Sequence, residues 1–185
     1  MRKLIALAGL AAMTAAAADA QTPAPPAAPP CSAPEYRQLD FWVGEWDLEF
    51  DQAPGQPVGR ATNSIRKDEY GGCAIVERFV QPRGRPGGGD YLGTSYSSWD
   101  PQIGKWRQMW VDNAGTPFVL TGGAVTGQDH VFELVTTEAR GAPNPMIRRM
   151  IWQDVTADSL VWRWQGRQPD GSWSDLWVLR YKRRK

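Results

Sequence analysis

The chain has 185 residues, with 21 lysines and arginines against 20 aspartates and glutamates, and a net charge of +1. This near-neutral charge argues against a nucleic-acid partner, because binding a phosphate backbone requires a basic surface. The length fits one domain with a sizeable core once a short leader and a spacer are set aside.

The first twenty residues have the pattern of a secretory signal peptide. Arg2 and Lys3 give a positive start, Leu4 to Ala17 form an apolar run, and Ala18-Asp19-Ala20 offers a small-residue cleavage site. The run is shorter than the roughly 20 apolar residues of a membrane span. We therefore predict an exported protein, periplasmic or secreted, with no membrane span. Without residues 1–20 the chain keeps 19 basic and 19 acidic residues.

Residues 21–30, QTPAPPAAPP, are too rich in proline for a helix or a sheet and indicate a disordered spacer. The folded domain is predicted over residues 31–185. Its two cysteines, Cys31 and Cys73, favour a disulfide in an exported chain. That bond would close a loop of ~43 residues and contribute ~4 kcal/mol by its effect on chain entropy. Free thiols, or a lipid anchor on Cys31, are the alternatives.

Alternating apolar and polar residues predict short strands along the rest of the chain. In the first, Trp42, Trp46, Leu48 and Phe50 share one face, and acidic residues occupy the other. A glycine-rich loop at 82–90 is expected to be mobile, and a helical turn or two is expected near Pro34 to Leu39. The predicted strands are 42–50, 58–68, 73–80, 91–99, 105–112, 117–125, 130–137, 146–154, 159–167 and 173–182.

The ten tryptophans support an all-β body with an aromatic interior. Several recur at even spacing and so share a strand face; these pairs are Trp106 and Trp110, Trp162 and Trp164, and Trp173 and Trp177. Strands separated by regular turn signals indicate a sandwich or a barrel. The hairpin-length connections favour a single antiparallel up-and-down barrel of about ten strands, because closure removes the exposed edges.

Two sequence patterns resemble known families. Gly44-Glu45-Trp46 resembles the G-x-W element that opens lipocalins and other calycin barrels. In those barrels the tryptophan plugs the base and a basic residue of the last strand packs across it, and Arg180 is the candidate here.

A longer pattern, LDFWVGEWDLEF, GGCAIVERF, GTSYSSWD and KWRQMWVDNAG, resembles an exported bacterial family known as domain of unknown function 1579. The resemblance covers about Cys31 to Tyr181. It implies a lipocalin-like barrel and export, supports the disulfide, and implies no activity.

Residues suited to metal binding or nucleophilic catalysis are scarce. The single histidine, His130, follows Asp129 in a predicted turn, where a surface position is favoured. One histidine and two distant cysteines do not make a zinc site, and no nucleophile elbow or P-loop pattern occurs. We predict no metal, no cofactor and no catalytic residue.

Polar residues on the predicted lining faces are better candidates. Gln108 lies between two tryptophans, and Asp175 lies between Trp173 and Trp177. A buried polar group needs a partner or a ligand. The alternative is a surface position for Glu77 or Asp175, because a one-residue shift in register reverses every assignment. The predicted ligand-binding residues are Asn63, Glu77, Gln108, Trp110, Arg148 and Trp164.

The favoured function is binding of a small apolar or aromatic ligand, because a barrel of this size can hold one. The loop at 82–90 would gate its mouth. One alternative is a cell-envelope interaction or structural protein whose tryptophans fill the barrel. The other is an isomerase- or hydrolase-like enzyme on small molecules, with Glu77 as general base and Arg148 stabilising an anion.

Overall fold

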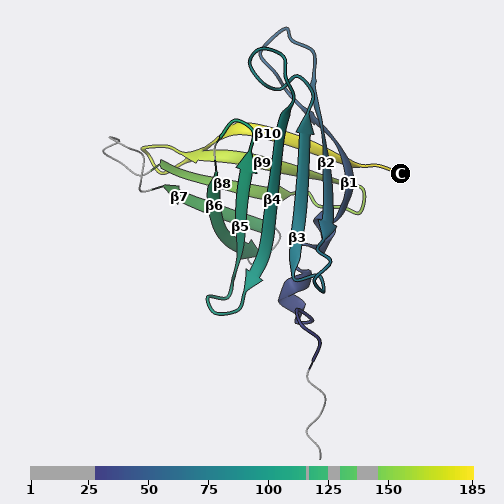
Figure 1. The fold of residues 1–185 in the computed structure, drawn as a ribbon. Coiled ribbons are helices and arrows are strands. Elements are labelled where there is room, and N and C mark those ends of the chain that lie inside the picture. The colour runs from purple at the N-terminus through teal and green to yellow at the C-terminus, as the bar shows by residue number, and fades with distance from the viewer. Residues whose placement is uncertain (1–27, 116, 125–129, 137–145) are drawn as a thin grey trace, which may run out of the picture.

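The structure is a computed structural model that describes residues 28–115, 117–124, 130–136 and 146–185. The described strands form a closed antiparallel barrel in which every strand pairs with its neighbours in the sequence and β1 pairs with β10 (Figure 1). The predicted up-and-down barrel is confirmed. Its strands are β1 (Gly44–Phe50), β2 (Gly59–Lys67), β3 (Ala74–Gln81), β4 (Tyr91–Asp100), β5 (Lys105–Asp112), β6 (Phe118–Ala124), β7 (His130–Thr136), β8 (Met146–Gln153), β9 (Ser159–Arg167) and β10 (Trp173–Arg183).

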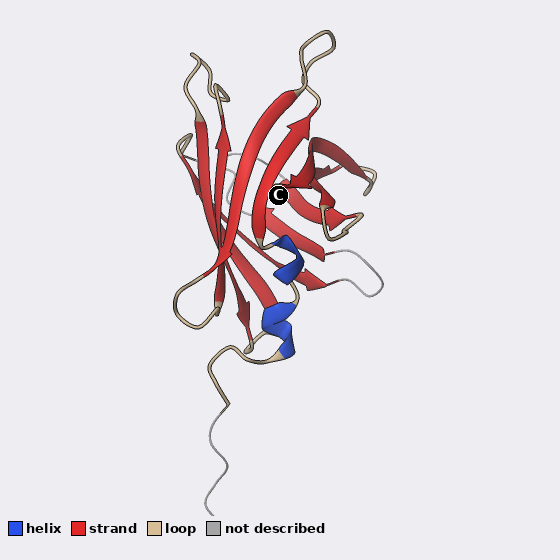
Figure 2. Cartoon of the chain, turned by 90° about the vertical axis from the view of Figure 1, so that its right-hand side faces the viewer, coloured by secondary structure: helices blue, strands red, loops and turns tan. Residues whose placement is uncertain are grey.

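Two short 3-10 helices, η1 (Pro34–Arg37) and η2 (Asp40–Trp42), lie at the lower end of the barrel ahead of β1 (Figure 2). Leu39, between them, and Trp42 are fully buried. The indole N–H of Trp106 donates to Gln38 Oε1 at 3.0 Å, which ties β5 to this segment. The helical segment therefore packs against the lower end of the barrel interior.

The first strand begins later than predicted. Trp42 belongs to η2, where the Trp42 N–H donates to the Leu39 carbonyl and the Val43 N–H to the Asp40 carbonyl. Pairing with β2 begins at Gly44. Assigning Trp42 to the strand was wrong, although its ring is buried; the Trp46 indole N–H donates to the Trp42 carbonyl at 2.8 Å.

A disulfide joins Cys31 to Cys73, as predicted. It connects the residues before η1 to the β2–β3 connection. The alternatives of free thiols and a lipid anchor are therefore not realised, since both cysteines of the chain are paired. The predicted signal peptide and most of the predicted spacer lie outside the described residues.

The alternation of β1 is that of a half-buried strand. Trp46, Leu48 and Phe50 are buried, while Glu45 and Glu49 are exposed. Burial of the apolar face is the main stabilising contribution of such a strand. The strands β2 and β5 show the same alternation, so every second side chain of each strand faces the interior of the barrel.

The strand β10 departs from simple alternation. Its register against β9 shifts between Asp175 and Trp177. Asp175 consequently pairs with Arg163 and Gln165, and the Arg149 guanidinium covers Trp173, whereas Trp177 faces the interior. Placing Trp173 and Asp175 on the face of Trp177 was therefore wrong, because a β-bulge reverses the parity of the strand. The alternative of a surface position for Asp175 is the one observed.

His130 does not lie in a solvated turn. It is the first residue of β7, is half-buried, and its ring centroid lies 4.6 Å from that of Phe41. Within the described part of the chain, no helix has the length and apolar character needed to cross a membrane.

Candidate functional site

A cavity of about 140 Å³ lies inside the barrel. Four of the six predicted ligand-binding residues line it: Glu77, Gln108, Trp110 and Trp164. The other lining residues are Trp42, Phe79, Tyr91, Phe118, Met150, Trp162, Trp177, Leu179 and Tyr181. A wider hollow of about 920 Å³ runs along β1 and β10, where exposed charged side chains such as Asp47, Arg60 and Lys182 line it.

Aromatic rings form a continuous wall around the cavity. Phe118 stacks between Trp110 and Trp164, with centroid distances of 6.3 Å and 5.6 Å. Trp162 and Trp164 are almost parallel, with an interplanar angle of 4°. These rings are only partly buried, so the aromatic part of the cavity reaches solvent. Trp162 and Trp164 are two apart on β9 and so share a face, and Phe118 on β6 pairs directly with Trp110 on β5.

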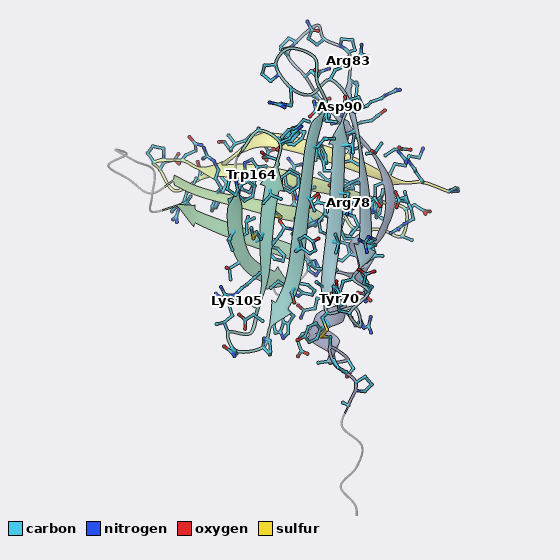
Figure 3. The ribbon with its side chains drawn as sticks, in the orientation of Figure 1. Tyr70, Arg78, Arg83, Asp90, Lys105 and Trp164 are labelled. Carbon is cyan, nitrogen blue, oxygen red and sulfur yellow. A yellow bond between two sulfur atoms is a disulfide. The ribbon has the colours of Figure 1, made fainter. Side chains whose placement is uncertain are left out.

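The position of Trp164 shows toward which end of the barrel the aromatic wall lies. In Figure 3 Trp164 lies in the upper half, nearer the loop that carries Arg83 and Asp90 than the turns at Tyr70 and Lys105. The aromatic wall therefore lies toward the end opposite the two short helices.

The carboxylate of Asp112 holds two of the lining side chains, Trp110 and Tyr91, in place. The Trp110 indole N–H and the Tyr91 hydroxyl both donate to Asp112 Oδ2, at 3.0 Å and 2.9 Å. Burial, and then the adjacent Asp112 carboxylate, raise the pKa of Tyr91. The Trp110 ring lies against the backbone of Gly93, and a Cβ at that position would overlap it. Gly93 therefore leaves the space that the indole occupies.

The floor of the cavity is polar and deeply buried. Glu77 accepts hydrogen bonds from Asn63 Nδ2 at 2.7 Å and from Ser95 Oγ at 2.6 Å. Asn63 Nδ2 also donates to the Tyr181 hydroxyl at 3.0 Å. All four side chains are at least nine-tenths buried. Asn63 does not line the cavity, but its hydrogen bond holds the Glu77 carboxylate in place.

Burial dominates the electrostatics of this floor. It raises the pKa of Glu77, and the hydrogen bonds from Ser95 and Asn63 offset part of that effect. Burial also raises the pKa of Tyr181, and the Glu77 charge adds to it. The nearby Trp42 indole lowers the pKa of Tyr181 slightly, but its buried N–H makes no hydrogen bond with any described residue.

Gln108 is the second polar group on the floor. Its Nε2 donates to Ser97 Oγ at 2.9 Å. Its Oε1 is buried and accepts no hydrogen bond from the described residues, and the same holds for Asn63 Oδ1. A buried acceptor without a partner costs free energy, so Gln108 Oε1, which lines the cavity, is suited to a donor on a bound molecule.

Arg148 is not among the residues that line the cavity. It pairs with Gly166 across β8 and β9, and its guanidinium occupies the space that a Cβ at Gly166 would need. Its role in ligand binding stays a prediction, as do those of the other predicted residues. Sequence reasoning missed Ser95, Ser97 and Tyr181, because their contacts with the floor depend on the register between strands, which one strand's pattern does not show.

The cation over Trp46 is Arg183 and not the predicted Arg180. The Arg183 guanidinium lies 4.0 Å from the Trp46 ring centroid. Arg180 points outward and makes a bidentate ion pair with the carboxylate of Asp51. No group of three or more potential metal-ligating side chains occurs among the residues that the structure describes.

Comparison with known proteins places the chain in a family but assigns no activity. The crystal structure of Rv2717c from M. tuberculosis matches with a TM-score of 0.52 and 18% identity, covering 83% of this chain and 99% of that one. At that identity the similarity shows the fold alone. No curated protein matches the chain. The family described as "Protein of unknown function (DUF1579)" matches residues 32–183, and the chain belongs to this family.

Proposed function

We propose that the protein binds a small apolar or aromatic molecule of about one ring inside its barrel. The observation that carries this proposal is the cavity of about 140 Å³ with a wall of stacked aromatic rings. An engineered apolar cavity of about 150 Å³ binds benzene, so the volume suits a single ring. The cavity also argues against a barrel filled entirely by its own tryptophans.

The polar floor would orient such a ligand. Glu77 and Gln108 are the only hydrogen-bonding side chains besides the two tyrosines and the indoles in the described lining. Binding sites commonly combine an apolar wall with a few polar groups that fix orientation. A flat ring is expected to stack on Phe118 or Trp164, with its polar substituent toward Glu77.

The test is a calorimetric titration of the folded protein with toluene and, separately, with anthracene, followed in parallel by tryptophan fluorescence. We expect saturable binding of toluene with one site and no binding of anthracene, because three fused rings exceed the cavity. Equal responses to both compounds would indicate partition onto the surface and would contradict the proposal.

A pair of adjacent substitutions provides the control. Leu179→Phe adds a ring inside the cavity, whereas Val178→Phe adds the same ring on the outer face of β10. We expect Leu179→Phe to abolish toluene binding and Val178→Phe to retain it. Circular dichroism establishes that both variants are folded. Unchanged binding by Leu179→Phe would place the ligand elsewhere.

We also propose that the protein acts outside the cytoplasm. The predicted signal peptide supports this, and the Cys31–Cys73 disulfide is of the kind that persists in oxidising compartments. Cell fractionation with N-terminal sequencing of the mature protein tests it. Cleavage after Ala20 is expected, and an intact N-terminus in the cytoplasmic fraction would contradict it.

A further inference from the structure

The buried carboxylate of Glu77 has only neutral partners. It faces the cavity, is 6% exposed, and accepts hydrogen bonds from Asn63 and Ser95. No lysine or arginine of the described part of the chain is among the groups that act on it. An ionised carboxylate in such surroundings is costly unless a cation pairs with it.

The second polar group of the floor also presents an acceptor. Among the described residues Gln108 Oε1 is buried without a partner, while its Nε2 donates one hydrogen to Ser97 Oγ. Asn63 Nδ2 donates both of its hydrogens, to Glu77 and to Tyr181. Glu77 and Gln108 therefore offer oxygen acceptors to the cavity, which suits a group rich in hydrogen-bond donors.

The aromatic wall is compatible with positive charge. The faces of tryptophan, tyrosine and phenylalanine rings attract cations. The two cation–π pairs found among the described residues, Arg183 with Trp46 and Arg149 with Trp173, involve no ring that lines the cavity. The rings of the cavity wall are thus available to a cation that enters from outside.

From these three observations we infer that the ligand is an organic cation, a one-ring arylalkylamine in its protonated form, whose ammonium group pairs with Glu77 and donates to Gln108 Oε1. This inference rests on the proposed function and specifies the class of its ligand. The ring would lie between Trp110, Phe118 and Trp164, and the ammonium group would lie at the floor.

Binding of such a cation is coupled to the protonation of Glu77. In the empty cavity burial raises the pKa of this carboxyl, and the titratable groups that its charge reaches are Tyr181 and Tyr91, the latter hydrogen-bonded to Asp112. The cation needs the ionised form. Affinity for a protonated amine therefore rises with pH while Glu77 loses its proton, and affinity for an uncharged analogue does not.

The experiment compares benzylamine with benzyl alcohol, which have nearly the same shape but differ in charge. Calorimetric titrations of the folded protein are made at pH 5 and pH 8. At pH 8 we expect benzylamine to bind about tenfold or more tightly than benzyl alcohol, as for a charge-assisted hydrogen bond. We expect this preference to shrink at pH 5. Toluene serves as the apolar reference.

Matched variants assign the preference to the floor. Glu77→Gln is expected to lower the ratio of benzylamine to toluene affinity at pH 8 about tenfold, whatever its effect on toluene itself. Glu69→Gln, at an exposed position outside the cavity, is expected to leave that ratio unchanged. Gln108→Met, which removes the unpartnered acceptor, is expected to lower the ratio of benzylamine to toluene affinity severalfold. It also keeps the test informative if Glu77→Gln fails to fold.

The outcomes separate the two proposals. If benzyl alcohol or toluene binds as tightly as benzylamine at pH 8, the cation inference is overturned and the proposed function stands. If none of the three compounds binds, both are overturned. If benzylamine is preferred equally by the protein and by its Glu77→Gln and Gln108→Met variants, the cation lies elsewhere and the inference fails.

Discussion

Arg183 lies over Trp46 and fastens the end of the last strand to the start of the first. Its guanidinium stacks 4.0 Å from the indole centroid, and it donates to the Val43 and Phe41 carbonyls at 2.7 Å and 3.1 Å. Its Nε donates to the Ala157 carbonyl at 2.7 Å. A Cβ at Gly44 would overlap the guanidinium, and Gly44 adopts a φ of 144°. The glycine of the G-x-W element is thus explained by the space that Arg183 occupies.

Replacing Arg183 by alanine is expected to destabilise the barrel substantially. The change removes the cation–π contact and leaves three carbonyls without their donor, so we expect a loss of about 2–4 kcal/mol in the free energy of unfolding. Urea denaturation measures it. Arg180→Ala is the control, since Arg180 forms only an exposed ion pair with Asp51 and a much smaller loss is expected. Equal losses for the two variants would show that the stack on Trp46 is not important for stability.

The basic residue over Trp46 shows how far the alternation of inward and outward residues along β10 can predict a contact. Leu179 and Tyr181 are buried, so the next residue on the same side of β10 is Arg183. The sequence prediction selected Arg180 as a basic residue near the end of this strand, but Arg180 has the opposite parity and faces outward. Arg183, which has the right parity, lies one residue beyond the predicted strand end at residue 182.

Most of the fold could be predicted because turn signals and alternation agree along the chain. All ten strands were predicted at nearly their observed positions. The site was harder, because it depends on which strands are adjacent and in what register. Glu77 pairs directly with Ser95 across β3 and β4, a relationship that no periodicity within one strand reveals. The bulge near Asp175 likewise leaves no mark in the sequence pattern.

Gly93→Ala is expected to disturb the cavity wall. The added methyl group would overlap the Trp110 ring, which must then rotate away from Asp112 or push β4 outward. We expect a loss of about 1–3 kcal/mol in stability, as for overpacking of a core, together with weaker toluene binding. Gly123→Ala is the matched control, since a Cβ there has only an ordinary contact at 3.9 Å. A Gly93→Ala variant as stable as Gly123→Ala would contradict the observed packing of Trp110.

Removing the disulfide is expected to lower stability without changing the cavity. The bond spans 42 positions in the sequence. A cross-link of that length restricts the unfolded chain and contributes up to ~4 kcal/mol. The double variant Cys31→Ser, Cys73→Ser should therefore unfold at lower urea concentration. Its toluene affinity should match that of the unaltered protein, because neither cysteine lines the cavity. Changed affinity with unchanged stability would contradict this separation.

The protonation of Glu77 is expected to make stability depend on pH. Burial raises its pKa in the folded state above the ordinary glutamate value of 4.5. The folded protein therefore holds this proton more tightly than the unfolded chain does. The resulting stabilisation is fully present below pH 4.5 and is lost as the pH rises through the folded-state pKa.

Comparison with Glu77→Gln isolates this contribution, because the glutamine cannot titrate. The free energy of unfolding of the variant minus that of the unaltered protein should increase as the pH is raised above 4.5. Urea denaturation at a series of pH values measures this difference. The exposed Glu69→Gln variant shows the effect of losing a carboxylate at the surface. A difference for Glu77→Gln that falls with rising pH would mean that an unrecognised positive charge stabilises the ionised carboxylate in the empty barrel, and the floor would then have no need of a cationic ligand.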